Sequence, residues 1–112
     1  MIRIIILFLL PVTLLAQRNR AEENAIRQVM NTQQEAWNRA DIETFMEGYW
    51  KSDSLKFIGR NGITYGWQTT LDNYKKSYPT PDAMGKLTFT ILTLDILSET
   101  SAFMIGRWHL KR

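Results

Sequence analysis

The chain has 112 residues, 45% of them hydrophobic and 22% charged, a composition typical of one globular domain and not of a disordered chain. Its formal net charge of +3 comes from scattered basic residues, not from a dense basic run with interleaved aromatic side chains, so nucleic-acid binding is not expected. Because the chain contains no cysteine, the fold has no disulfide and must depend on a small apolar core.

Residues 1–16 are predicted to be a secretory signal peptide. Arg3 supplies a positive start, residues 4–15 are almost wholly apolar, and a polar segment begins after Ala16, where we expect cleavage. An uncleaved membrane anchor is the alternative, but the apolar run is shorter than the ~20 residues that a spanning helix needs. No cysteine follows it, which excludes a lipoprotein anchor. We therefore expect an exported protein, periplasmic or secreted, with its mature domain at 17–112 and no stable membrane anchor after cleavage.

The segment 18–40 is predicted to form an amphipathic helix, because its apolar residues recur at spacings of three and four. Asn19 or Asn24 is expected to cap its start. The predicted stripe consists of Ile26, Val29, Met30, Gln33 and Trp37.

Asp41 is predicted to cap a second, shorter helix, since its carboxylate can accept the free N–H groups of the first turn. A short hairpin follows, with strands at 55–57 and 63–65 and a turn at Asn61-Gly62. The apolar face of the second helix is Ile42, Phe45, Met46 and Tyr49.

A third helix is indicated by the apolar spacing from Trp67 through Leu71 and Tyr74 to Tyr78, and Pro79 and Pro81 are expected to end it. This helix begins directly after Gly66, so the short hairpin and the helix are close neighbours along the chain.

Two long strands follow the third helix. In the segment 87–97 the apolar phase changes near Ile91-Leu92, and a β-bulge there would bring Leu87, Phe89, Ile91, Leu92, Leu94 and Ile96 to one side. After a turn at 98–101, the strand 102–110 alternates with large apolar groups in both phases at its start, which predicts a central strand covered on both faces there. The pattern stops at Arg112 without a turn or polar tail, so we expect further strands beyond it.

This order of elements resembles the NTF2-like superfamily, and in detail its SnoaL-like, DUF4440-type members. The resemblance implies an α+β fold, a cone of three N-terminal helices packed on a strongly curved antiparallel sheet, which members normally close with about two further strands. The residues that carry it are Ala36–Asp41 (AWNRAD), Phe45–Phe57 (FMEGYWKSDSLKF), Gly66, Tyr74, Tyr78-Pro79 and Gly106-Arg107-Trp108.

Cones of this kind open at a mouth that is lined by aromatic side chains and suits a small, largely apolar ligand. Each aromatic residue has a simpler interpretation as part of the core, because rings at helical or strand spacing usually are. The candidates for ligand binding are Trp37, Trp50, Phe57, Trp67, Met104 and Trp108, with Tyr49 and Tyr74 beside them.

Asp53 is the candidate for chemistry, because the ketosteroid-isomerase branch of the superfamily has its general base in this neighbourhood and an apolar pocket raises a carboxylate's pKa. Tyr49 or Tyr74 would donate to a developing oxyanion. The simpler interpretation is that Ser52-Asp53-Ser54 is an ordinary turn.

His109 is the one histidine, and strand alternation puts it with Arg107 on the face opposite the pocket, as a surface or interface residue. A lone histidine without cysteine cannot build a nitrogen or sulfur metal site, and the sequence has no phosphate loop or dinucleotide fingerprint, so neither a metal nor a cofactor is expected.

The first functional hypothesis is an exported domain that binds a small molecule and forms a homodimer through its sheet, with Arg107 available to pair with an acid across the interface. The alternatives are an isomerase- or dehydratase-like enzyme based on Asp53, and a non-catalytic dimerisation or interaction module with a filled pocket.

Overall fold

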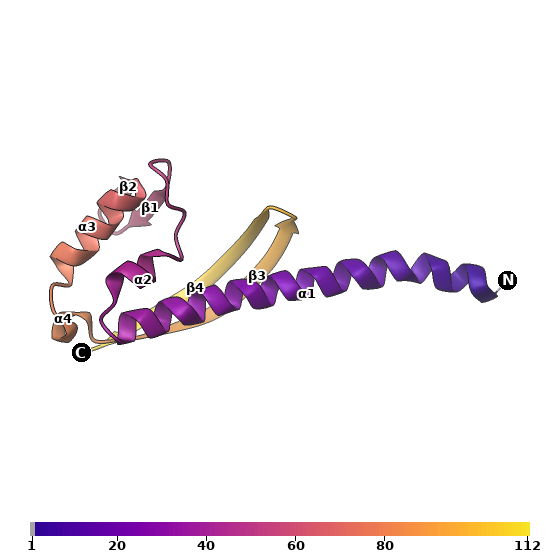
Figure 1. Cartoon of the computed structure of the whole chain (residues 1–112), viewed down its shortest axis with the longest axis horizontal. Coiled ribbons are helices and arrows are strands. Elements are labelled where there is room, and N and C mark those ends of the chain that lie inside the picture. Colours follow the sequence, from indigo (N-terminus) through magenta and orange to yellow (C-terminus); the bar gives the residue numbers. More distant parts are fainter. Residues whose placement is uncertain (1) are drawn as a thin grey trace.

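The computed structural model describes the backbone of residues 2–112 and the side chains of residues 13–112. Met1 and the side chains of residues 1–12, which make up most of the predicted signal peptide, lie outside the described part. Figure 1 shows α1 running along a bent hairpin of two long strands, with the other elements gathered at the C-terminal end of α1 and its N-terminal part extending far beyond the rest. The elements are α1 (Ile2–Asn38), α2 (Ile42–Met46), β1 (Lys56–Gly59), β2 (Gly62–Tyr65), α3 (Trp67–Ser77), α4 (Pro81–Met84), β3 (Lys86–Ser98) and β4 (Ser101–Lys111).

The first helix is longer than predicted. Because α1 begins at Ile2, neither Asn19 nor Asn24 caps its start, and the predicted boundary near residue 18 is wrong. Ala16, Gln17 and Arg18 are good or neutral helix formers, so nothing in this stretch ends the helix. The described part of the chain contains no helix whose length and apolarity together meet the requirement for a membrane span.

Only the C-terminal half of α1 packs on the body of the protein (Figure 1). Leu14 and Leu15 are exposed, whereas Arg18 already reaches the tip of the long hairpin, where its Nη1 pairs with Glu99 Oε1 at 2.8 Å. The predicted stripe faces inward from Ile26 to Trp37, apart from Val29, which is exposed.

The junction between α1 and α2 is formed as predicted. Ala40 adopts a positive φ of 62°, which turns the chain out of the helix, and the Asp41 N–H donates to the Ala36 carbonyl at 2.9 Å. Asp41 Oδ1 then accepts from the Thr44 N–H at 3.1 Å and its Oδ2 from Thr44 Oγ1 at 2.6 Å, so the predicted N-cap is confirmed.

The short hairpin β1–β2 is confirmed, with its turn one residue earlier than predicted. Gly59 pairs with Gly62, so the loop consists of Arg60 and Asn61. Gly62 has a φ of 111°, which glycine adopts without steric cost. Within the described residues this hairpin forms a two-stranded sheet separate from β3–β4.

The third helix ends before Pro79 as predicted, but α4 was not predicted. Pro81 was interpreted only as a helix stop, whereas it occupies the first turn of a new helix, and Thr80 Oγ1 accepts from the Ala83 N–H at 3.1 Å. Gly85 ends α4 with a φ of 65° beside the Lys111 backbone, where a side chain would clash with the carbonyl oxygen.

The predicted β-bulge in β3 is confirmed. The register with β4 shifts between Ile91 and Thr93, which makes Leu92 the extra residue. Leu92 itself is exposed, so its predicted place on the inner face is wrong. The bulge brings the two apolar phases of the strand together on the inner face, as Leu87, Phe89, Ile91, Leu94 and Ile96.

The strand β4 is not covered on both faces. It pairs with β3 along one edge only, and within the described chain no strand lies along the other. Phe103 and Ile105 on its outer face are 51% and 46% exposed, and Trp108 on its inner face is 70% exposed. The sequence prediction of a central strand is therefore wrong for the described structure, because apolar residues in both phases do not by themselves supply covering layers.

A polar clamp joins α1 to the edge of β3 that faces away from β4. Asn38 Nδ2 donates to the Leu87 carbonyl at 3.0 Å, Asn38 Oδ1 accepts from the Leu87 N–H at 2.7 Å, and Gln34 Oε1 accepts from the Phe89 N–H at 2.8 Å. Four residues of a helix rise about 6 Å and two residues of a strand about 6.6 Å. Side chains four positions apart on the helix therefore lie at the same spacing as every second residue of the strand. The clamp fixes which side chains of β3 point toward the helices.

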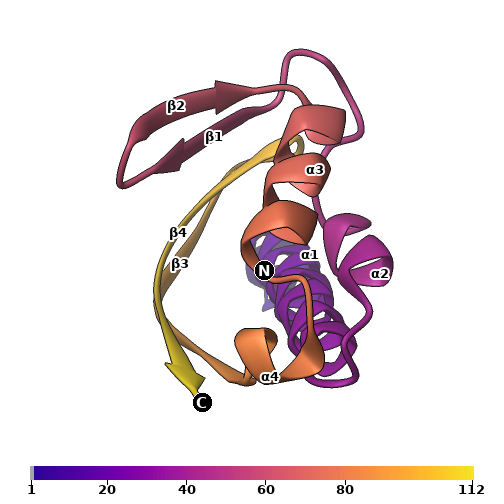
Figure 2. The same ribbon diagram turned by 90° about the vertical axis from the view of Figure 1, so that its left-hand side faces the viewer.

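The core lies between α1, α2, α3 and the start of β3. Figure 2 shows the long strands curving around the helices. The buried apolar residues are Ala36, Trp37, Ile42, Phe45, Met46, Leu71, Met84 and Leu87.

Candidate functional site

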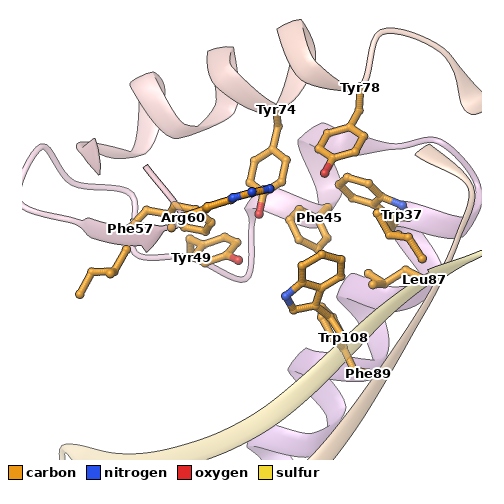
Figure 3. A pocket seen from close by; sticks show the side chains of 13 residues that line it. Trp37, Phe45, Tyr49, Phe57, Arg60, Tyr74, Tyr78, Leu87, Phe89 and Trp108 are labelled. Carbon is orange, nitrogen blue, oxygen red and sulfur yellow. The ribbon is translucent and has the colours of Figure 1, made fainter. Parts of the chain in front are cut away.

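An open cavity of ≈ 630 Å³ lies between the short hairpin, the helices and the concave face of β3–β4 (Figure 3). Its volume falls in the range of pockets for small ligands. The lining residues are Trp37, Phe45, Tyr49, Phe57, Ile58, Gly59, Arg60, Tyr74, Tyr78, Leu87, Phe89, Trp108 and Leu110.

The helical side of the cavity is a continuous set of edge-to-face aromatic contacts. Trp37 contacts Phe45, Tyr74 and Tyr78 with ring centroids 5.1, 5.7 and 5.0 Å apart. Tyr74 also contacts Phe45 at 5.4 Å and Phe57 at 5.8 Å. Such contacts stabilise ring pairs beyond their burial, so these rings hold one another in place.

Trp37 is fixed by burial and by a hydrogen bond within the fold. Its side chain is 3% exposed, and its Nε1 donates to the Met84 carbonyl at 3.0 Å. The indole N–H is therefore used within the fold, and the cavity receives only the ring of Trp37. Such a ring supplies apolar surface to a ligand and no hydrogen bond.

Two tyrosine hydroxyls beside the cavity stay protonated. Burial raises the pKa of Tyr74 well above its ordinary value, and the hydroxyls of Tyr49 and Tyr78 shift it in the same direction. Burial also raises the pKa of Tyr49, a shift that its hydrogen bond with Tyr74 partly opposes. At neutral pH both groups are phenols, able to donate a hydrogen bond but unable to serve as bases.

The sheet side is made of Leu87 and Phe89 from β3 and of Trp108 and Leu110 from β4. Phe89 is directly opposite Trp108 in the strand register, and Leu87 opposite Leu110. In Figure 3, Trp108 points from the sheet toward the aromatic rings of the helices. Because Trp108 is highly exposed, the sheet side is the open side of the cavity.

Arg60 is the one charged residue among those that the structure describes around the cavity. It comes from the loop of the short hairpin, and Figure 3 shows its side chain extending into the cavity. Sequence reasoning did not select Arg60, because a basic residue in a hairpin loop is usually a solvated surface residue.

The structure brings five of the predicted residues to this cavity. All five line it: Trp37 from α1, Tyr49 from the turn after α2, Phe57 from β1, Tyr74 from α3 and Trp108 from β4. Their role in binding stays a prediction. The lining residues that sequence reasoning missed as site residues are Phe45, Ile58, Gly59, Arg60, Tyr78, Leu87, Phe89 and Leu110.

Three predicted lining residues lie elsewhere. Trp50 is 65% exposed, outside the cavity, because it follows α2 in an extended loop. Trp67 packs against the core, where its Nε1 donates to the Met46 carbonyl at 2.8 Å and Lys51 Nζ lies 4.9 Å from the ring. Met104 is half-buried farther along the sheet and does not line the cavity.

The predicted position of Asp53 at the pocket rim is wrong. Asp53 is exposed and does not line the cavity. It belongs to a turn in which Ser52 Oγ accepts from the Ser54 N–H at 3.0 Å, so the simpler interpretation of this segment holds. Asp53 therefore lies in solvent, apart from the aromatic lining of the cavity.

His109 and Arg107 are exposed on the outer face of β4, as strand alternation predicted. They lie opposite Thr88 and Thr90 in the register. Among the described residues, no group of three or more His, Cys, Asp and Glu side chains is placed to hold a metal ion.

The fold and sequence are similar to those of solved proteins. An NTF-2 like protein of unknown function from Shewanella oneidensis MR-1 has a TM-score of 0.79 and 42% identity, over 81% of this chain and 75% of that one. A domain of unknown function with a cystatin-like fold from Nostoc punctiforme PCC 73102 has a TM-score of 0.64 and 24% identity, over 80% of this chain but 56% of that one.

No family model matches the sequence, and no curated protein matches it either, so the SnoaL-like, DUF4440-type assignment stays a prediction. The α+β fold of helices on a curved antiparallel sheet is the predicted one. With 42% identity across three quarters of the Shewanella protein, the chain belongs to the NTF2-like family.

Proposed function

We propose that the protein binds a small, largely apolar molecule in the cavity between α1, α3 and the concave sheet. The observation that carries this proposal is the lining itself. Six aromatic rings from the helices and the short hairpin, and two from the sheet, surround ≈ 630 Å³ of open space. Rings left facing open space bind apolar ligands, because a ligand removes their apolar surface from water.

The lining supports binding over catalysis. Among the described residues around the cavity there is no aspartate, glutamate or histidine that would act as a general base. Tyr49 and Tyr74 hydrogen-bond to each other, and their raised pKa values keep both as phenols, so the pair can donate one further hydrogen bond to a ligand oxygen. An isomerase or dehydratase would need a base from outside this set, since Asp53 faces solvent.

The binding test compares two tryptophans. The full chain is titrated with the neutral fluorophore N-phenyl-1-naphthylamine, and saturable binding is expected. Trp108→Ala should weaken the affinity several-fold, whereas Trp50→Ala, which removes an exposed tryptophan away from the cavity, should leave it unchanged. Failure of the wild-type protein to bind, or equal losses in the two variants, would contradict the proposed site.

We also propose that the protein is a homodimer that pairs through the outer face of β3–β4. Phe103 and Ile105 expose apolar surface there, together with Leu92 at the bulge. Clusters of exposed apolar side chains on a sheet favour association. In sedimentation equilibrium the wild type should be dimeric and Ile105→Lys monomeric; a monomeric wild type would exclude this interface.

Export is the remaining proposal, and it rests on the sequence of residues 1–16. Cleavage after Ala16 would keep Arg18 and its ion pair with Glu99 at the tip of the long hairpin. N-terminal sequencing of protein purified from its host should begin at Gln17. A mature chain that begins at Met1 would contradict cleavage. The SnoaL-like, DUF4440-type assignment belongs with these proposals.

A further inference from the structure

Resting on the proposed binding function, we infer that the ligand is a small monocarboxylate with a flat apolar body, and that Arg60 binds its carboxylate group. The charge of the cavity leads to this inference. Arg60 is the one charged side chain in the described lining, and no carboxylate balances it there. The tyrosines of the lining do not balance it either, because Tyr49 and Tyr74 stay protonated.

The Arg60 side chain is free to serve a ligand. The ion pairs of the described residues join Arg18 to Glu99, Arg39 to Asp41 and Lys75 to Glu43, and none involves Arg60. Within the described chain it also has no hydrogen-bond or ring partner. A guanidinium presents two parallel N–H groups, which match the two oxygens of a carboxylate.

The hairpin loop directs Arg60 toward the cavity. Gly59 and Gly62 flank the loop, and a Cβ at Gly62 would meet nothing within 4 Å, so the space beside Gly62 is open. Gly59 also lines the cavity, which leaves the approach to Arg60 without a bulky neighbour on that side. An arginine in this place reaches the ligand from the hairpin, opposite Trp108 and Phe89.

Other ligand charges fit less well. An aromatic box without Arg60 would suit a quaternary ammonium ion, but the guanidinium repels a cation. A phosphate monoester carries up to two negative charges, and one arginine would leave part of that charge unpaired among apolar rings. The hydrogen-bonded pair of neutral phenols, Tyr49 and Tyr74, can add a hydrogen bond to the ligand without adding charge.

The flat body follows from the two aromatic sides. The rings of Trp37, Phe45 and Tyr74 meet edge to face on the helical side, and Phe89 and Trp108 face them from the sheet. A planar ring between these sides can stack on one and present its edge to the other. A branched aliphatic body of the same volume would fill the space without those contacts.

One other anion site has to be distinguished, because Arg60 also borders a groove on the far side of the hairpin, which is lined in part by Lys76. An anion held there would use both cations and no aromatic side chain from the sheet. Lys76→Gln is therefore the matched control for Arg60→Gln: each removes one positive charge near the same loop, but Lys76 does not line the aromatic cavity.

The experiment titrates the full chain by calorimetry with three ligands that share one ring system: 2-naphthoate, 2-naphthalenemethanol and 2-naphthyl phosphate. We expect 2-naphthoate to bind the wild type roughly tenfold or more tightly than the alcohol, the order of a charge-assisted hydrogen bond. Arg60→Gln should remove this preference without changing the affinity for the alcohol, and Lys76→Gln should preserve it.

The outcomes separate the two proposals. If the alcohol binds but the wild type does not prefer 2-naphthoate, the carboxylate inference is overturned and the aromatic cavity stands. Tighter binding of 2-naphthyl phosphate, or an equal loss in Lys76→Gln, overturns the assignment of a monocarboxylate to Arg60. If neither the alcohol nor 2-naphthoate binds, the proposed function fails together with the inference.

Discussion

The two sides of the cavity differ in how they are held. On the helical side Trp37 is 3% exposed, donates to a backbone carbonyl and contacts three other rings. On the sheet side Trp108 is 70% exposed on a strand with one paired edge. The helical side is thus core and site at once, whereas Trp108 on the sheet side contributes to the site with little part in the core.

This difference indicates where stability and binding can be separated. A change on the helical side should damage both, because the same rings fill the core and face the cavity. A change at Trp108 should affect binding alone, since most of its ring is exposed and its removal uncovers little buried surface.

Trp37→Ala should lower the free energy of unfolding by about 3–5 kcal/mol, the usual cost of removing a large buried aromatic side chain. Trp108→Ala should change it by less than about 0.5 kcal/mol, as for most exposed positions. Urea unfolding, followed by circular dichroism, measures both. Similar losses in the two variants would show that the sides are not held differently.

Asn38→Ala should cost about 1–3 kcal/mol, because it leaves the N–H and the carbonyl of Leu87 without their partners. Asn31→Ala is the matched control on the same helix, where the side chain makes an exposed hydrogen bond to Glu35. Its effect should stay within about 0.5 kcal/mol. An Asn38 variant as stable as this control would mean that the clamp does not join α1 to the sheet.

Alkaline pH should weaken the helical side specifically. The pKa values of Tyr49 and Tyr74 are raised in the folded state, so their contribution to stability is complete below the unfolded value of about 10 and is lost as pH rises above it. Tyr74→Phe should flatten this decline, while Tyr65→Phe, at an exposed tyrosine on β2, should leave it unchanged. Urea unfolding at several pH values, with tyrosinate absorbance recorded in parallel, measures the effect. Equal flattening in both variants would contradict it.

Local patterns predicted most of the elements. The helical stripe that ends at Trp37, the cap at Asp41 and the change of phase at Ile91-Leu92 each depend on residues close in sequence. The start of α1 was missed because no residue near Ala16 interrupts a helix. The short helix α4 was missed because a proline signals both the end of one helix and the start of the next.

The site was harder to predict than the elements. Tyr49, Tyr74 and Trp108 have the apolar periodicity that marks inward-facing residues, so they could be selected. Trp67 has the same signal but packs on the core, and Arg60 has none because its placement depends on where the hairpin lies in space. The clamp from Asn38 to Leu87 joins residues 49 positions apart, which no local pattern indicates.

A crystal structure of the protein with 2-naphthoate would show directly whether the cavity binds a carboxylate through Arg60. We predict the naphthyl ring between Trp108 and the rings of Trp37 and Tyr74, with the carboxylate within hydrogen-bonding distance of the Arg60 guanidinium. Naphthoate bound at another surface, or a cavity that the side chains of Trp108 and Phe89 fill by themselves, would contradict it.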